Sequence, residues 1–228
     1  LLFRYAIKVA QFCFYQNTND ILTFAHTLPV YLIIGLPALG GLVVGPIIYF
    51  GAREAKGHGV PEVMEAVALK GGRIRPRVAF VKILASGISI GSGGSVGREG
   101  PIVQIGSSIG SSLAQILKAP HMRQRTLVGC GAAAGIAATF NAPIAGALFA
   151  VEVLLGDFGL ATFSPVVLSS VTATTISRYY FGDFPAFIIP TYKLVSLWEF
   201  LFYPLLGVTA GFVALLFIFS LYKCEDFF

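Results

Sequence analysis

Residues 91–101 read GSGGSVGREGP and interrupt a long apolar region of the chain. Proline is favoured in the first turn of a helix, so the motif predicts a helix that starts at Pro101. The N–H groups around residues 98–100 are free of intrahelical partners, and they lie at the positive end of the helix dipole. A helix start within an apolar region is tolerated only where it lines a cavity, which indicates an anion-binding transport site.

The rest of the chain has the composition of a membrane protein. Of its 228 residues, 56% are hydrophobic and 12% are charged, and the mean hydropathy is +0.80. The usual charged share of a soluble domain is roughly 25%. Uncharged runs that reach the ~18 residues needed for a membrane-spanning helix cover residues 21–52, 100–117, 126–151, 158–177 and 200–222. We therefore expect an all-α polytopic membrane protein whose single transmembrane domain covers residues 1–228.

The apolar runs and their breaks also predict individual helices and their topology. We expect helices at residues 1–16, 28–50, 78–97, 102–117, 127–140, 144–155, 160–180 and 200–222. Residues 53–82 hold seven of the sixteen Lys and Arg residues, and the positive-inside rule therefore places this stretch in the cytoplasm. From there we expect residues 118–125 to lie outside and Lys223 inside. Because membrane orientation accounts for the net charge of +5, we expect no nucleic-acid partner.

Glu99 is the charged residue that the glycine-rich motif places at the predicted anion site. Its carboxylate is itself an anion, so it competes with a solute anion until it is protonated or swings aside, as a gate would. The alternative is a tight turn in which Glu99 only caps its helix, but a glutamate within an apolar tract favours a functional role. Residues 93–97 also match the GxSxG motif of hydrolases. That reading requires a preceding strand and then an acid and a histidine downstream. Because the only downstream histidine is His121, with no acid except Glu99 between it and Ser95, we expect no enzyme.

A second motif, GHGVPE at residues 57–62, repeats the pattern of glycines around one polar side chain before a proline. Pro61 predicts another helix start, with Glu62 in its first turn. His58 can donate a hydrogen bond to an anion when neutral and is a cation when protonated. The alternatives are an interfacial histidine in a cytoplasmic loop, or a metal pair with Glu62, for which no third ligand lies nearby.

A third motif, NAPIAGALFAVEV, spans residues 141–153. Asn141 can cap the helix that Pro143 starts. Glu152 near the end of the run is either functional or a boundary charge. No cysteine or histidine spacing predicts a metal site, and we expect no cofactor.

Together the three motifs, in this order and with these gaps, resemble the CLC family of chloride channels and chloride/proton antiporters. The resemblance covers essentially the whole chain and implies a CLC-type fold with broken, tilted helices. A complete member contains two inverted-topology halves, and this chain resembles the first half plus one helix. The transported ligand would be chloride or a similar small anion. The resemblance further implies a homodimer, with an interface around residues 144–180, in lipid, most simply the plasma (inner) membrane.

The resemblance also implies roles for individual residues. Glu99 matches the gating glutamate of the family, and the backbone amides of Arg98, Glu99 and Gly100 would bind the anion from outside. His58, followed by Gly59, stands where many members have a serine that helps to hold the central anion, so this departure leaves the anion preference open.

The position after Glu152 separates the two transport mechanisms of the family. Antiporters that resemble this sequence carry two consecutive glutamates here, and the second accepts the internal proton. In this chain Val153 takes the second place and cannot relay a proton, which favours a channel gated by Glu99. The alternative is a proton-coupled antiporter with an unconventional internal proton route.

Overall fold

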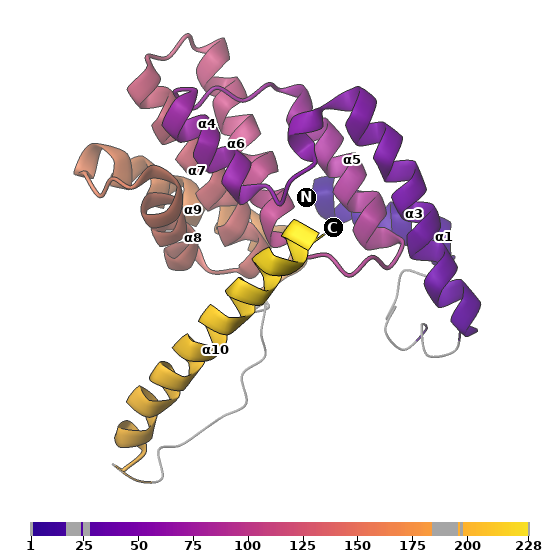
Figure 1. The fold of residues 1–228 in the computed structure, drawn as a ribbon. Coiled ribbons are helices and arrows are strands. Elements are labelled where there is room, and N and C mark those ends of the chain that lie inside the picture. The colour runs from indigo at the N-terminus through magenta and orange to yellow at the C-terminus, as the bar shows by residue number, and fades with distance from the viewer. Residues whose placement is uncertain (1, 17–23, 25–27, 184–195, 197, 228) are drawn as a thin grey trace. The chain divides into compact units, whose positions relative to one another are not determined.

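The computed structural model describes residues 2–16, 24, 28–183, 196 and 198–227, and these contain helices and connections without a β-strand. Figure 1 shows their arrangement. In chain order the helical elements are α1 (Leu2–Tyr15), α3 (Val30–Gly51), η1 (Arg53–Ala55), α4 (Val60–Leu69), α5 (Arg77–Gly91), α6 (Glu99–Ile116), α7 (His121–Phe140), α8 (Pro143–Phe149), η2 (Ala150–Leu155), α9 (Leu160–Phe181) and α10 (Glu199–Phe227).

The expected membrane architecture is confirmed. Three described helices are long and apolar enough to cross a membrane, over Val30–Gly51, Leu160–Phe181 and Glu199–Cys224. The predicted helices at residues 28–50, 160–180 and 200–222 correspond to these within a few residues. Helix α6 begins at Glu99 rather than at Pro101, so the proline lies in the first turn instead of starting it.

Two units make up the chain, residues 1–186 and residues 187–228. The second contains α10, in which every residue from Phe200 to Cys224 is exposed. The first contains all the other helices and the packed core, which is built from small side chains such as Val63, Val128 and Ala133. The interpretation of residues 1–228 as one transmembrane domain stays a prediction.

Helices α6 and α7 pack backbone against backbone. A Cβ atom at Gly106 would overlap the carbonyl oxygen of Gly131, and one at Gly131 would overlap the carbonyl oxygen of Gly106. Small residues allow this close approach, which maximises van der Waals contact where lipid gives no hydrophobic driving force between helices. The α6–α7 pair therefore forms the rigid centre of the first unit.

The connection between α4 and α5 is fastened to the C-terminal half of α6. The hydroxyl of the fully buried Ser111 donates to the carbonyl oxygen of Gly72 at 2.7 Å and accepts from the Ile74 N–H at 2.8 Å. The Nε2 of Gln115 donates to the Ile74 carbonyl oxygen at 2.8 Å. A Cβ atom at Gly72 would lie 3.2 Å from the backbone of Arg125, at the start of α7.

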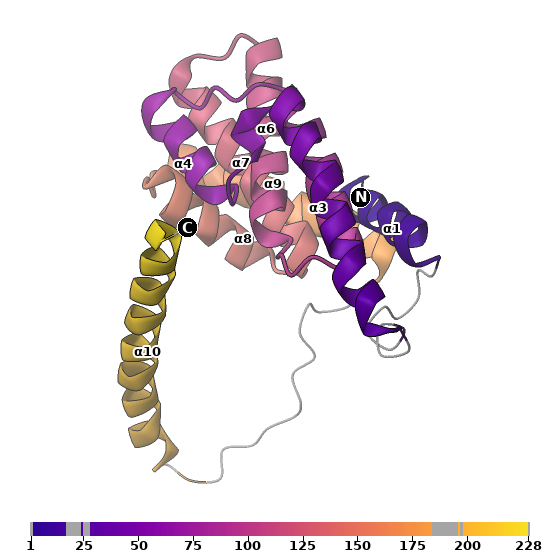
Figure 2. The same ribbon diagram turned by 45° about the vertical axis from the view of Figure 1, so that its right-hand side comes forward.

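These contacts correct the predicted topology. Residues 70–76 and residues 117–120 connect their helices at the same end of the first unit, as Figures 1 and 2 both show. Residues 118–125 therefore cannot lie across the membrane from the basic connection after α4. The physical reason is that α5 and α6 lie between the two connections, and two passes in opposite directions return the chain to the end that it left.

Asn141 also differs from its predicted role. It ends α7 in the left-handed conformation, with φ of 56°, and Ala142 precedes α8. Its side chain donates to Asp183 at 2.8 Å and accepts from the Arg178 guanidinium at 2.6 Å. Asparagine tolerates the left-handed region that helix ends commonly adopt, so the residue ends one helix instead of starting the next.

Candidate functional site

The N-terminal ends of α4 and α6 meet at two glycines. Gly59 precedes α4 with φ of 110°, a conformation that side chains rarely adopt, and it is buried. A Cβ atom at Gly59 would overlap the carbonyl oxygen of Gly100, and one at Gly100 would overlap the carbonyl oxygen of His58. The two helix starts that the motifs predict at residues 61 and 101 thus lie in backbone contact.

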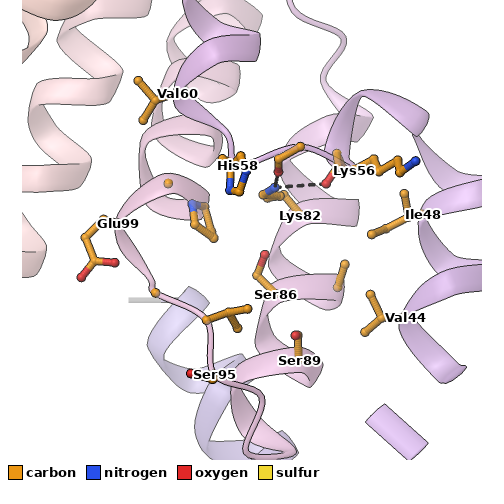
Figure 3. Close-up of a pocket in the computed structure, with 17 residues that line it drawn as sticks. Val44, Ile48, Lys56, His58, Val60, Lys82, Ser86, Ser89, Ser95 and Glu99 are labelled. Atoms are coloured by element: carbon orange, nitrogen blue, oxygen red, sulfur yellow. Dashed lines mark hydrogen bonds between the residues drawn. The ribbon is translucent and has the colours of Figure 1, made fainter. Parts of the chain in front are cut away.

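An open pocket of about 720 Å³ lies beside this meeting point. Its charged and titratable lining residues are Lys56, His58, Lys82 and Glu99, and α5 adds the hydroxyl-bearing Ser86 and Ser89 (Figure 3). Because each free helix start behaves like roughly half a positive charge, the pocket combines two partial positive ends with lysine side chains. The carboxylates of Glu99 in the pocket lining and of Glu62 in the first turn of α4 offset part of this positive charge.

Lys82 is the pocket residue that the sequence analysis missed as a site residue. It lies within α5 and is 4% exposed. Its Nζ donates to the carbonyl oxygens of Ala55 at 3.0 Å and Gly57 at 2.7 Å (Figure 3). It forms no salt bridge with an acidic residue among those that the structure describes. The two carbonyls fix the position of the ammonium in the pocket lining, and the Glu62 carboxylate interacts electrostatically with its charge.

Glu62 has a local role that differs from the metal pair considered above. Its carboxylate accepts from the Gly59 N–H at 2.7 Å and lies against Gly57, where a Cβ atom would overlap Oε1. A carboxylate in the third position of a helix that reaches back to the residue before it is half of a capping box. No group of three or more potential metal ligands occurs among the described residues. Glu62 thus fixes the turn that carries His58.

Glu99 is the first residue of α6, and its side chain is exposed. A Cβ atom at Gly97 would overlap its Oε2, so the carboxylate folds back over that glycine. In Figure 3 the carboxylate points away from His58 and Lys82. The structure therefore places Glu99 at the edge of the pocket, with its carboxylate directed away from the two basic side chains.

The other predicted residues divide between the pocket and more distant positions. Gly100 lines the pocket. Arg98 precedes α6, but its side chain lies with Arg4 in the lining of two other cavities, so only its backbone adjoins the site. Glu152 and Val153 lie in the π-helical segment η2, are exposed, and do not line the pocket.

The structure thus combines apolar helices with two glycine-flanked helix starts beside a pocket that lysines and a histidine line. The sequence profile of the voltage-gated chloride channel family matches residues 40–228. The chain belongs to this family, also known as CLC.

Relatives support this assignment. A ClcB-like chloride channel protein of Ralstonia nicotianae is 37% identical over 92% of this chain and 50% of its own length. The voltage-gated ClC-type chloride channel ClcB of Yersinia pestis is 37% identical over 80% of this chain and 44% of its own length. The chain thus spans about half the length of the curated relatives it matches.

Solved structures share the fold. A slow cyanobacterial Cl⁻/H⁺ antiporter superposes with a TM-score of 0.73 at 26% identity, over 92% of this chain and 50% of that one. A CLC-type fluoride/proton antiporter superposes with a TM-score of 0.69 at 29% identity, over 93% of this chain and 53% of that one. The CLC-type helical fold predicted from the motifs is therefore confirmed.

Proposed function

We propose that this chain forms part of a pathway for the selective passage of chloride or a similar small anion, with no cofactor besides the transported ion. The observation that carries the proposal is the meeting of the α4 and α6 starts at Gly59 and Gly100 beside the cationic pocket. His58, Gly59, Arg98, Glu99 and Gly100 would contribute the anion site, mostly through backbone amides.

The electrostatics of this site suit conduction. Removing an anion from water into a low-dielectric medium costs several kcal/mol even after relaxation. Converging helix starts and the buried Lys82 offset part of this cost without placing a flexible cation on the ion. Binding of this kind is favourable enough for entry and weak enough for exit, as conduction requires.

Glu99 would gate the pathway from its position at the edge of the pocket. When ionised it competes with the solute anion for the amides at the start of α6, and when protonated it releases them. Val153 in place of a proton-accepting glutamate supports a channel, because an aliphatic side chain cannot relay protons to Glu99.

The second candidate is a proton-coupled antiporter. It is supported by the two solved relatives, which are a Cl⁻/H⁺ antiporter and a fluoride/proton antiporter. His58 lines the same pocket as Glu99 and could carry a proton in place of the missing glutamate.

One measurement separates the two mechanisms. The natural full-length protein is reconstituted in liposomes, a proton gradient is imposed at fixed chloride concentrations, and the reversal potential is recorded. A channel gives the Nernst potential of chloride whatever the proton gradient, whereas an antiporter gives a potential that moves with it. Absence of any anion current or flux in protein that remains folded would contradict both.

Two further properties complete the proposal. We expect a homodimer whose interface draws on residues 144–180, where α9 presents exposed apolar side chains such as Leu168 and Val171. We also expect residence in the plasma (inner) membrane. Cross-linking through single cysteines on α9 in native membranes tests both expectations.

A further inference from the structure

The end of the first unit opposite the pocket carries a dense group of cations. The two connections at this end and the helix turns beside them supply Lys70, Arg73, Arg75, Arg77, Lys118, Arg123 and Arg125, which we call the basic rim. All of these residues are exposed except Arg125, which is half-buried. They come from two segments more than forty positions apart in sequence, so the rim is visible only in the fold.

Few acidic groups neutralise the rim. Lys70 pairs with Glu65 at 2.8 Å, and Arg75 pairs with Glu54 at 3.4 Å. Asp157 is stabilised electrostatically by Arg125, which contributes to a pKa below the usual range for an aspartate, although hydrogen bonds from Gly159 and Thr162 contribute more.

The other rim cations form no salt bridge with an acidic residue in the part of the chain that the structure describes. An excess of positive charge therefore remains at this end.

The rim is a fixed surface rather than a flexible basic tail. Ser111 and Gln115 tie the first connection to α6 through the hydrogen bonds to residues 72–74. A Cβ atom at Gly71 would lie 2.7 Å from Nδ1 of His121, so the first connection also contacts the start of α7. The spacing of the cations is consequently set by the fold.

Exposed apolar side chains adjoin the rim on every helix that ends there. Leu69 is 78% exposed, Ile116 76%, Met122 69% and Phe80 69%, and each lies within a few residues of a rim cation. In a membrane protein such side chains contact acyl chains. The cations next to them consequently lie at the depth of the lipid phosphates.

We propose that the basic rim binds the headgroups of anionic phospholipids and holds this end of the protein at the cytoplasmic leaflet. Polybasic surfaces beside a membrane are attracted to anionic lipid, and arginine forms bidentate hydrogen bonds with phosphate. A free phosphate ion shares the headgroup chemistry, but only a lipid also satisfies the apolar side chains. The proposal is independent of the anion pathway, because no rim residue lines the pocket.

The test uses full-length protein in detergent, with phosphatidylglycerol, phosphatidylcholine and inorganic phosphate as probes and native mass spectrometry to count bound lipid. The variant Arg73→Gln/Arg123→Gln removes one exposed cation from each segment. The control Lys8→Gln/Arg53→Gln removes two exposed cations that lie outside the rim. We expect the rim variant to bind phosphatidylglycerol at least about tenfold more weakly, and the control to bind like the wild type.

Several outcomes would overturn the proposal. Equal binding of phosphatidylglycerol by the wild type and the rim variant would do so, and this is also the result expected if an acidic protein is the true partner. An equal loss in the control would show general charge attraction. Displacement of the lipid by millimolar phosphate would indicate an ion site instead. The wild type supplies a further check without mutation, because its preference for phosphatidylglycerol over phosphatidylcholine must fall in 1 M salt.

Discussion

At its N-terminal end α6 meets α4 backbone to backbone, whereas at its C-terminal end it is held by side-chain hydrogen bonds to the connection before α5. The first end has glycines at the contact and lies beside the buried Lys82. The second presents exposed arginines to the surroundings. Basic side chains thus lie near both ends of one helix, and the N-terminal end depends on backbone geometry that tolerates far less change.

The largest expected effect is the loss of stability when a side chain is added at the contact between the α4 and α6 starts. In Gly100→Ala the new Cβ atom overlaps the His58 carbonyl oxygen, and a backbone atom cannot move aside as a flexible side chain can. We expect destabilisation of about 3 kcal/mol or more, at the upper end of overpacking effects. The loss of stability is measured by thermal unfolding, with size-exclusion chromatography as the readout of folded protein.

The matched control is Gly41→Ala in α3, where nothing lies within 4 Å of the new Cβ atom. This variant should unfold at the wild-type temperature or slightly above it. Similar stability of the two variants would show that the contact between the α4 and α6 starts is looser than the structure indicates.

The next effect concerns the gate. Glu99→Gln keeps the size of the side chain but removes the charge that competes with the anion, so flux should lose its dependence on external pH. Wild-type flux should fall as external pH rises, because deprotonation restores the competitor. Liposome flux assays over a range of external pH measure both.

Glu65→Gln is the control, since this exposed carboxylate pairs with Lys70 and does not line the pocket. It should retain the wild-type pH profile. A Glu99→Gln protein that still closed at high pH would remove Glu99 from the gating role.

Lys82 tests whether the pocket needs a full charge in addition to helix dipoles. Lys82→Met preserves much of the apolar stem but removes the ammonium from two carbonyl oxygens. We expect chloride affinity to fall by at least about tenfold, because a unit charge within ~12 Å at an effective dielectric constant of ~20 contributes about 1.4 kcal/mol or more. Isothermal titration calorimetry with chloride measures the affinity.

Lys82→Arg retains the charge and serves as the comparison. It should keep most of the affinity even if its larger head strains the turn at Gly57. If both variants lost affinity equally, the role of Lys82 would be to shape the turn and not to attract the anion.

The sequence predicted the long helices well, because a long apolar run has few alternatives in a membrane. It failed on the side of residues 118–125, because α5 and α6 pass in opposite directions between residues 70–76 and 117–120 and return the chain to the same end. Lys82 was invisible as a site residue because only the fold shows that carbonyl oxygens at residues 55 and 57 surround it.

Only part of the site could be predicted from the sequence, because a motif shows local structure but not which side chains the fold brings together. Proline and glycine at residues 59–61 and 100–101 mark helix starts locally, so their meeting could be predicted from the motifs. The direction of the Glu99 carboxylate and the capping by Glu62 depend on the missing Cβ atoms of Gly97 and Gly57. The motifs contain these glycines but do not show which carboxylate lies against each of them.

The last prediction concerns the C-terminal end of α6. Ser111→Ala removes the hydroxyl that bridges the Gly72 carbonyl oxygen and the Ile74 N–H. Both backbone groups then stay buried but lose this hydrogen-bond partner. Losing such a partner costs about 1–3 kcal/mol. Ser112→Ala is the control, because its hydroxyl bonds only to Ser108 within the same helix. Thermal unfolding should therefore shift for Ser111→Ala and hardly at all for Ser112→Ala, while chloride affinity stays at the wild-type value in both. A change in chloride affinity with Ser111→Ala would mean that the two ends of α6 are coupled, and the contrast between a rigid pocket and an independent basic rim would then have to be given up.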